Sequence, residues 1–114
     1  MAQVIDMKLE LRSNLRNYFD VFKQISEAEL CFYEDYPVVT ATTDGAIALG
    51  SITTADIFYI SSDQAITYKL NGSATAVTLD ANCHHIYMGT AITALTVTNA
   101  SGSTAYLDIL FAGA

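Results

Sequence analysis

The fold is decided by residues 65–79, which read AITYKLNGSATAVTL. Residues 65–70 run directly into Asn71-Gly72, the pair that most favours a tight turn between two antiparallel strands. Residues 75–79 then form the returning strand. The stretch therefore predicts a β-hairpin in the middle of the chain, and similar segments extend from it in both directions.

Short apolar segments separated by small polar turns fill the chain from about Val38 to its end. Their spacing of roughly ten residues is typical of an antiparallel sandwich or barrel, and no connection has room for the crossover helix that parallel strands need. We predict an all-β fold, an antiparallel β-sandwich or jelly-roll-like barrel of about 8–9 short strands. The expected strands are residues 30–33, 38–43, 46–52, 56–60, 65–70, 75–79, 83–88, 91–99 and 104–111.

Three further turns are expected from small polar residues. Asp44-Gly45 predicts a tight hairpin, Gly89-Thr90 predicts a second turn, and residues 99–103 predict a wider hairpin loop. Within residues 91–99 the apolar positions change parity, so we expect a bulge at Thr93-Ala94. Pro37 fits an edge strand rather than a central one.

The first segment carries two periodicities at once. Apolar and charged residues alternate from Ile5 to Arg12, as in a strand, while apolar residues also recur every three or four positions as far as Ile25, as in a helix. We expect a strand to about Arg12, a turn at Ser13-Asn14 with Ser13 as a candidate N-cap, and then a short helix or a further extended stretch. This predicts an N-terminal arm, residues 1–29, and a β-sandwich domain, residues 30–114.

The composition points to a covered apolar surface. Hydrophobic residues make up 52% of the chain and charged residues only 15%, well below the roughly 25% that soluble domains carry. Because large exposed apolar patches are rare on monomers, we expect burial against copies of the same chain or a neighbouring protein. The alternative is a monomer coated with Thr and Ser.

The charge excludes one class of partner. The formal net charge is −7 with only five Lys and Arg residues, whereas nucleic-acid binders neutralise phosphates with many such residues. Four of the five cations are Lys8, Arg12, Arg16 and Lys23. The first segment is therefore suited to lie on an acidic surface of another copy, although an ordinary solvated face would have the same composition.

The opening residues 1–8 are interrupted by charges, so we expect neither a signal peptide nor a membrane span, and a protein made in a cytoplasm. In that reducing compartment, Cys31 and Cys83 are expected to be small core residues rather than a disulfide.

Cys83-His84-His85 is the one local group that suggests a metal. On a strand His84 and His85 point to opposite faces, so only Cys83 and His85 converge, and no second ligand pair stands at zinc-like spacing. We expect one histidine on the solvent face and the other under a loop.

Acidic and aromatic residues allow three further hypotheses. Paired carboxylates for glycoside cleavage would come from Glu27, Glu29, Glu34 and Asp35, which otherwise form a solvated rim. Calcium would be held by the turn residues Asp35, Asp44, Asp63 and Asp80, although turn Asp residues usually bond their own backbone. A glycan-binding face would use Tyr33, Tyr36, Tyr59, Tyr68, Tyr87 and Tyr106, which otherwise cover sheet faces. No serine lies in a Gly-x-Ser-x-Gly elbow, and we assign no catalytic, cofactor-binding or metal residue.

Three stretches resemble small virion proteins encoded in tailed-bacteriophage structural gene clusters: residues 45–55, 62–72 and 90–105. The resemblance covers roughly the last 70 residues. It implies a β-sandwich component of a phage head, connector or tail, present in several copies, without catalytic residues or cofactors.

The expected function is thus that of a non-enzymatic structural protein of a virion. Its expected partners are copies of itself and other virion proteins, with neither nucleic acid nor membrane. A carbohydrate- or receptor-binding module is the alternative.

Overall fold

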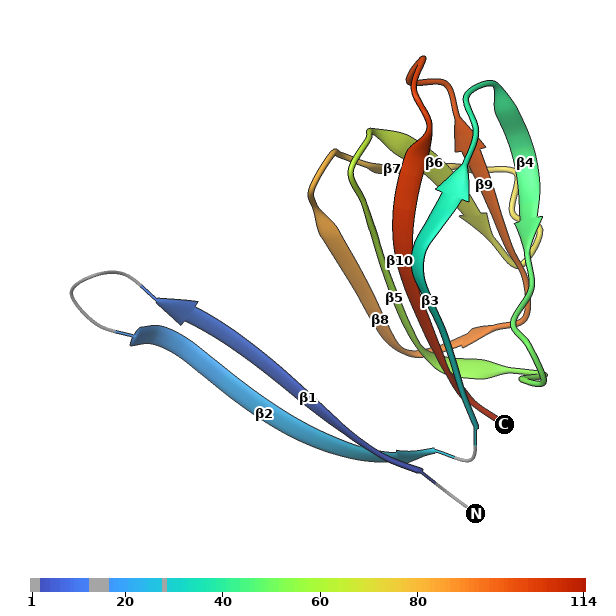
Figure 1. The fold of residues 1–114 in the computed structure, drawn as a ribbon. Helices are drawn as coiled ribbons and strands as arrows, with labels where there is room; N and C mark the ends of the chain where they lie inside the picture. The colour runs from blue at the N-terminus through green and yellow to red at the C-terminus, as the bar shows by residue number, and fades with distance from the viewer. Residues whose placement is uncertain (1–2, 13–16, 28) are drawn as a thin grey trace.

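The computed structural model describes residues 3–12, 17–27 and 29–114, with side chains for residues 29–114. Every regular element in this part of the chain is a β-strand, which confirms the all-β prediction (Figure 1). The strands are β1 (Gln3–Arg12), β2 (Asn17–Glu27), β3 (Glu29–Val38), β4 (Thr42–Ile47), β5 (Ala55–Ser62), β6 (Ile66–Leu70), β7 (Val77–Leu79), β8 (His84–Ile92), β9 (Leu95–Asn99) and β10 (Ala105–Gly113).

Eight of these strands form two packed antiparallel sheets. Sheet I has the order β3-β10-β5-β8, and sheet II has the order β4-β9-β6-β7. The pairings are nested, since β3 pairs with β10, β4 with β9, β5 with β8 and β6 with β7. A single long antiparallel ribbon, folded over so that its strands alternate between two sheets, is the jelly-roll topology.

The predicted hairpin at Asn71-Gly72 is confirmed and is the tip of this ribbon. Asn71 and Gly72 have φ angles of 57° and 69°, as the favoured hairpin turn requires. The Ser73 amide donates to the Leu70 carbonyl over 3.0 Å. The return strand β7 begins at Val77, two residues later than expected.

The hairpin predicted at Asp44-Gly45 is wrong, because β4 runs through this pair. The chain turns earlier instead, where the Thr42 amide donates to the Val39 carbonyl over 3.3 Å. Asp44 has a φ of 48° and lies where the register with β9 shifts. A residue that tolerates positive φ is used in a β-bulge as well as in a turn, so the pair Asp44-Gly45 does not by itself distinguish the two.

The turn predicted at Gly89-Thr90 is also wrong. β8 continues to Ile92, and Gly89, with a φ of 81°, lies where its register with β5 shifts. Likewise, Thr93-Ala94 is not a bulge within one strand. There the chain passes from sheet I to sheet II, which leaves Ile92 and Leu95 both buried despite their opposite parity.

Residues 99–103 join β9 to β10, so they cross between the sheets and do not form a hairpin loop. Asn99 organises this crossing although it is completely buried. Its Nδ2 donates to the carbonyls of Val38 and Ser103, each over 2.8 Å, and its Oδ1 accepts from the Ser101 amide over 3.0 Å. A buried amide is tolerated because its polar atoms are paired.

The core lies between the two sheets, and β10 is its clearest strand. Ala105, Leu107, Ile109 and Phe111 are all completely buried, as the alternation of residues 104–111 predicted. The Phe111 ring stacks on Phe58 of β5 with a centroid distance of 5.3 Å. Pro37 lies on β3, an edge strand of sheet I, and this prediction is confirmed.

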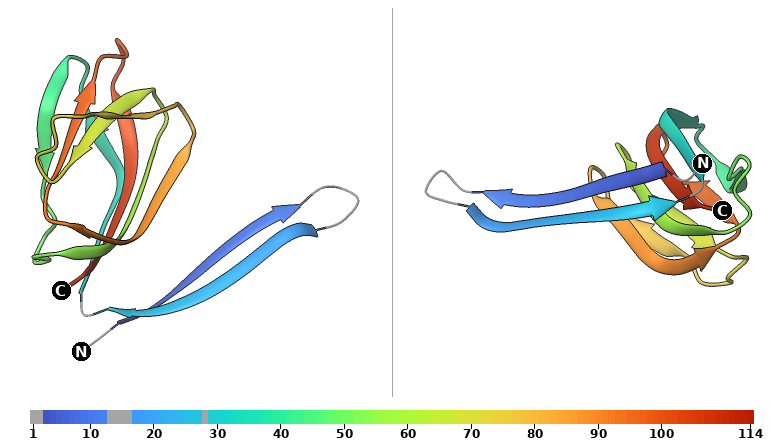
Figure 2. Two further views of the ribbon diagram at one scale, coloured as in Figure 1. Left: turned by 180° about the vertical axis from the view of Figure 1, so that it is seen from behind. Right: turned by 90° about the horizontal axis from the view of Figure 1, so that it is seen from below.

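The N-terminal hairpin, β1 and β2, forms a two-stranded sheet of its own. It extends away from the sandwich in all views (Figures 1 and 2). The strand to Arg12 is confirmed. Of the two alternatives for the following segment, the further extended stretch is confirmed and the short helix is wrong, because residues 17–27 pair with β1 as a strand. Pairing satisfies the backbone groups of a segment rich in aromatic and β-branched residues. The turn predicted at Ser13-Asn14 lies outside the described residues.

Candidate assembly surface

The outer face of sheet I carries two apolar rows that cross all four strands. The register places Leu30, Ala112, Ile57 and Met88 in one row and Phe32, Leu110, Tyr59 and Ile86 in the next. Their neighbours in sequence, such as Phe58 and Phe111, fill the core, so alternation directs these eight residues outward. We call this set the apolar face.

Exposure differs across the apolar face. Its edge residues are large and open to solvent, with Leu30 at 42%, Phe32 at 54%, Ile86 at 48% and Met88 at 40% exposure. Ile57 in the centre is 2% exposed although it lies outside the inter-sheet core. Clustered exposed apolar side chains are uncommon on a monomer and mark interaction surfaces.

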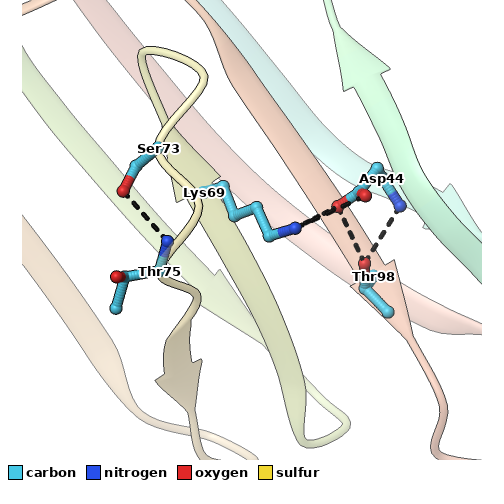
Figure 3. A network of polar contacts seen from close by, with 5 residues as sticks. All are labelled: Asp44, Lys69, Ser73, Thr75 and Thr98. Carbon is cyan, nitrogen blue, oxygen red and sulfur yellow. Dashed lines mark hydrogen bonds and ion pairs between the residues drawn. The ribbon is translucent and has the colours of Figure 1, made fainter.

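The outer face of sheet II has the opposite character. Its register rows consist of Ala46, Thr96 and Lys69, followed by Thr98, Thr67 and Thr78. We call this set the threonine face. Figure 3 shows its polar contacts, in which Lys69 Nζ lies 3.2 Å from Asp44 Oδ1 and the Asp44 amide donates to Thr98 Oγ1 over 3.0 Å. Near the tip of the ribbon, the Thr75 amide donates to Ser73 Oγ.

The sandwich is acidic around the apolar face. Glu29, Glu34 and Asp56 are exposed on strands β3 and β5 of sheet I. Lys69 is the one Lys or Arg in residues 29–114, and it lies on sheet II beside Asp44. Within residues 29–114 no Lys or Arg lies beside these three carboxylates, so a partner with its own cations would meet acidic groups at the rim of sheet I.

The two histidines lie on opposite faces of β8 and one of them is on the solvent face, as predicted, whereas the expectation that the other packs under a loop is wrong. His84 is exposed on the outer face, and its Nδ1 lies 2.7 Å from the Tyr59 hydroxyl. His85 points inward and contacts Tyr68 of sheet II rather than a loop. Cys83 is exposed, so the expectation that it is a core residue is wrong, whereas Cys31 is half-buried against the core.

Tyr68 connects the two sheets through a buried hydroxyl. This hydroxyl lies 2.6 Å from His85 Nδ1 and 2.8 Å from the Tyr87 hydroxyl. Burial, followed by the hydrogen bond with Tyr87, raises the pKa of Tyr68 well above its usual value. Burial also raises the pKa of Tyr33, whose hydroxyl donates to the Ala48 carbonyl. These contacts make Tyr68 part of the core packing.

Part of the predicted acidic set converges on an open hollow beside the apolar face, with a volume of about 280 Å³. The hollow, which we call the polar hollow, is lined by Asp35, Ser61, Ser62, Asp63, Asn82, His84, Tyr106 and Asp108. Two of its carboxylates accept hydrogen bonds from backbone amides. Asp108 Oδ1 accepts from the Asp35 amide over 3.0 Å, and Asp63 Oδ1 accepts from the Tyr106 amide over 2.8 Å.

The other predicted acidic groupings do not assemble in this way. Asp44 faces Lys69, and Asp80 lies in the turn before β8, where its carbonyl accepts from the Cys83 amide. Glu29 and Glu34 are exposed on β3, and the side chain of Glu27 lies outside the described residues. Among the described residues, no group of three or more His, Cys, Asp or Glu is arranged to hold a metal ion.

The tyrosines proposed as glycan platforms are mostly unsuited to that role. Tyr68 is 1% exposed, and Tyr33, Tyr36 and Tyr87 pack against the core. Tyr106 is 48% exposed and lines the polar hollow, so its ring is accessible to a ligand there.

Sequence reasoning did not identify the apolar face, although the signal was present. The run Ile57-Phe58-Tyr59-Ile60 is continuously apolar, and such a run predicts a strand covered on both faces. What the run does not tell is which other residues share the second face, because that depends on the register of four strands.

Comparison of the chain with protein-family models and with curated proteins finds no match. The part of the chain that the structure describes contains no helix long and apolar enough to cross a membrane.

Proposed function

We propose that this protein is a non-enzymatic structural subunit that assembles through the apolar face of sheet I. The observation that carries the proposal is the pair of apolar rows crossing all four strands, with four large side chains at 40% exposure or more. Burying such a surface is favourable by about 25 cal/mol per Å² of apolar area. The partners are further copies of this chain and neighbouring proteins of the same assembly.

The setting that we propose is a tailed-phage particle, where the protein serves as a head decoration, connector or tail accessory component. The resemblance of residues 45–55, 62–72 and 90–105 to small virion proteins supports this setting. The jelly-roll topology is compatible with it, since viral capsid domains are among the proteins that use this architecture. Such a protein is made in the host cytoplasm and incorporated into the virion.

Light scattering after size-exclusion chromatography tests the assembly proposal. The native chain should form an oligomer whose mass is stable, or rises with concentration, over about a tenfold range. Phe32→Ser combined with Ile86→Ser should weaken self-association by about tenfold or more, because truncating well-packed apolar anchors commonly costs 1 kcal/mol or more each. Thr78→Ala combined with Thr96→Ala, on the threonine face, is the matched control and should leave the mass unchanged.

Two results would contradict the proposal. One is a native chain that stays monomeric at every concentration. The other is an oligomer that the apolar-face variant leaves intact while circular dichroism and thermal melting show that the variant is folded.

A second candidate function, glycan or receptor binding, is favoured by the polar hollow. An exposed aromatic ring beside carboxylates and an amide is the chemistry that recognises sugars, and Tyr106, Asp35 and Asn82 supply it here. A glycan array should then show binding that Tyr106→Ala reduces at least about tenfold. Because Tyr68 is buried, a loss of binding on its replacement would report unfolding and not recognition.

A further inference from the structure

We infer that the apolar face of one copy is covered by the N-terminal hairpin of a second copy. This inference rests on the proposed self-assembly and names the segment that occupies the surface. It is supported by the residue pattern of the hairpin, the distribution of charge between hairpin and sandwich, the short connection between them, and the dimensions of the hairpin and sheet I.

The register of the hairpin gathers apolar residues at paired positions. Ile5 pairs with Ile25, Leu9 with Val21 and Leu11 with Phe19, and the intervening pair is Met7 with Lys23. Pairs two residues apart share one face of a two-stranded sheet. The hairpin is therefore amphipathic, and a two-stranded sheet with an apolar face is marginal in water until something covers that face.

The charges of the two parts are complementary. Lys8, Arg12, Arg16 and Lys23 belong to the first 28 residues, where they balance four acids. Residues 29–114 carry one lysine against eight acids, and Glu29, Glu34 and Asp56 lie exposed on sheet I. Lys23 pairs with Met7 and shares the face of Ile5, Leu9 and Leu11, so it is the cation that an incoming hairpin would bring toward these carboxylates. This attraction favours the hairpin over another acidic surface.

The connection favours exchange between copies over folding back within one copy. A single residue separates Glu27 at the end of β2 from Glu29 at the start of β3. Glu27 and Glu29 are two residue steps apart, which span at most about 7 Å, whereas sheets packed face to face lie about 10 Å apart. Covering its own sheet would therefore require the ends of β2 or β3 to unwind, and a second copy accepts the hairpin without this loss.

The length of the hairpin is sufficient to cover the width of sheet I. Strand β1 has ten residues, which corresponds to about 33 Å at the usual rise per residue. The four strands of sheet I span only about 15 Å between the axes of the outermost strands at about 4.8 Å spacing. One hairpin is therefore long enough to cover both apolar rows from β3 to β8.

Disulfide trapping tests the inference in full-length chains that lack the native thiols through Cys31→Ala and Cys83→Ser. One chain carries Leu9→Cys and a co-produced chain carries Ile86→Cys. Mild oxidation should give a covalent dimer whose linked peptides, identified by mass spectrometry, join position 9 to position 86. Pairing Leu9→Cys with Thr96→Cys, on the threonine face, is the matched control and should give at most one tenth of that product.

The outcomes separate this inference from the proposed function. If the native chain forms oligomers that Phe32→Ser with Ile86→Ser disrupts, but no link between positions 9 and 86 forms, the hairpin inference fails and the assembly surface stands. If a single chain carrying both cysteines links within itself as a monomer, the exchange between copies is also overturned. A native chain that is monomeric at every concentration overturns both proposals.

A double-mutant cycle gives an independent readout. Leu9→Ser with Val21→Ser in the hairpin should weaken self-association by about tenfold, as Phe32→Ser with Ile86→Ser does. Combining the two pairs should weaken it far less than a hundredfold, because both pairs remove the same contact. Fully multiplicative effects would mean that the hairpin and the apolar face do not touch, and would overturn the inference.

Discussion

The outer faces of the two sheets have the same strand count and opposite chemistry. Sheet II presents threonines with the Lys69–Asp44 pair, whereas sheet I presents eight apolar residues in two adjoining rows. The hydroxyl and charged groups of the threonine face can be solvated by water as they stand. On the apolar face Ile57 and Ala112 are buried, but Leu30, Phe32, Ile86 and Met88 stay exposed to solvent. This contrast is the basis of our proposal that sheet I is the side that binds a partner.

Composition left two alternatives open: a chain that buries an apolar surface against another chain, and a monomer coated with Thr and Ser. The two outer faces differ in which alternative they resemble. The Thr coat expected of a monomer lies on sheet II, whereas sheet I leaves Leu30, Phe32, Ile86 and Met88 exposed. The N-terminal hairpin, with most of the cations, is joined to β3 at the end of sheet I that carries Leu30 and Ala112.

The largest expected difference between the faces is at their central positions. Ile57→Ala should destabilise the fold by about 3 kcal/mol, because it removes a buried side chain and leaves a cavity. Thr67→Ala, on the threonine face of β6, should cost less than about 1 kcal/mol. Urea denaturation of both variants measures the contrast, and equal losses would mean that the apolar face is no better packed than the threonine face.

A second contrast concerns backbone packing at the end of sheet I that carries Leu30 and Ala112. A Cβ on Gly113 would overlap the backbone of Thr54 and Ala55, so Gly113→Ala should cost about 2 kcal/mol by forcing these segments apart. Gly102, with a φ of 85° and no atom within 4 Å, supplies the control. Gly102→Ala should cost only about 1 kcal/mol through backbone strain. Thermal melting that ranks the two the other way would contradict this packing.

The link between the sheets can be weakened through Tyr68. Tyr68→Phe should cost about 1 kcal/mol at neutral pH, since it removes the hydrogen bonds to His85 and Tyr87. Because the folded state raises the pKa of Tyr68, the unfolded chain loses this proton first, and stability should fall as the pH rises above about 10.

Tyr68→Phe should make that alkaline fall shallower, as measured by urea denaturation from neutral pH to about pH 11. Tyr106→Phe controls for the loss of a hydroxyl at an exposed position. An unchanged alkaline slope in the Tyr68 variant would show that this buried proton does not couple to folding.

The smallest expected effect is on the threonine face. Lys69 and Asp44 are 29% and 48% exposed, so Asp44→Asn should cost less than about 1 kcal/mol. The difference should shrink further between about 0.05 M and about 1 M salt, because salt screens exposed ion pairs. A cost of several kcal/mol that salt leaves unchanged would assign a structural role to this pair.

The local features that the sequence predicts correctly are those that depend on near neighbours. The turn at Asn71-Gly72, the alternation of β10 and the edge position of Pro37 each follow from a few adjacent residues. The failures at Asp44-Gly45 and Gly89-Thr90 have one cause. Positive φ is needed in bulges as well as in turns, and only the partner strand decides between them.

The candidate site was less accessible to sequence reasoning than the fold. The continuous apolar run of residues 57–60 is a signal for a strand covered on both faces, yet this local signal could not join Phe32 of β3 to Ile86 of β8. Those residues are 54 positions apart in sequence, and they share a row only through the register of β10 and β5. The polar hollow likewise requires that Asp35 of β3, Asp63 just after β5 and Asp108 of β10 line one site.

Three properties follow from the sequence alone: the chain is an antiparallel β protein, its ribbon turns back at Asn71-Gly72, and its share of charged residues is low for its content of hydrophobic ones. These properties reside in composition, alternation and single turns, which require no knowledge of distant contacts. The tertiary structure alone decided which outer face is apolar, because a face is a sum over four strands whose registers are set by the packing of the shared core.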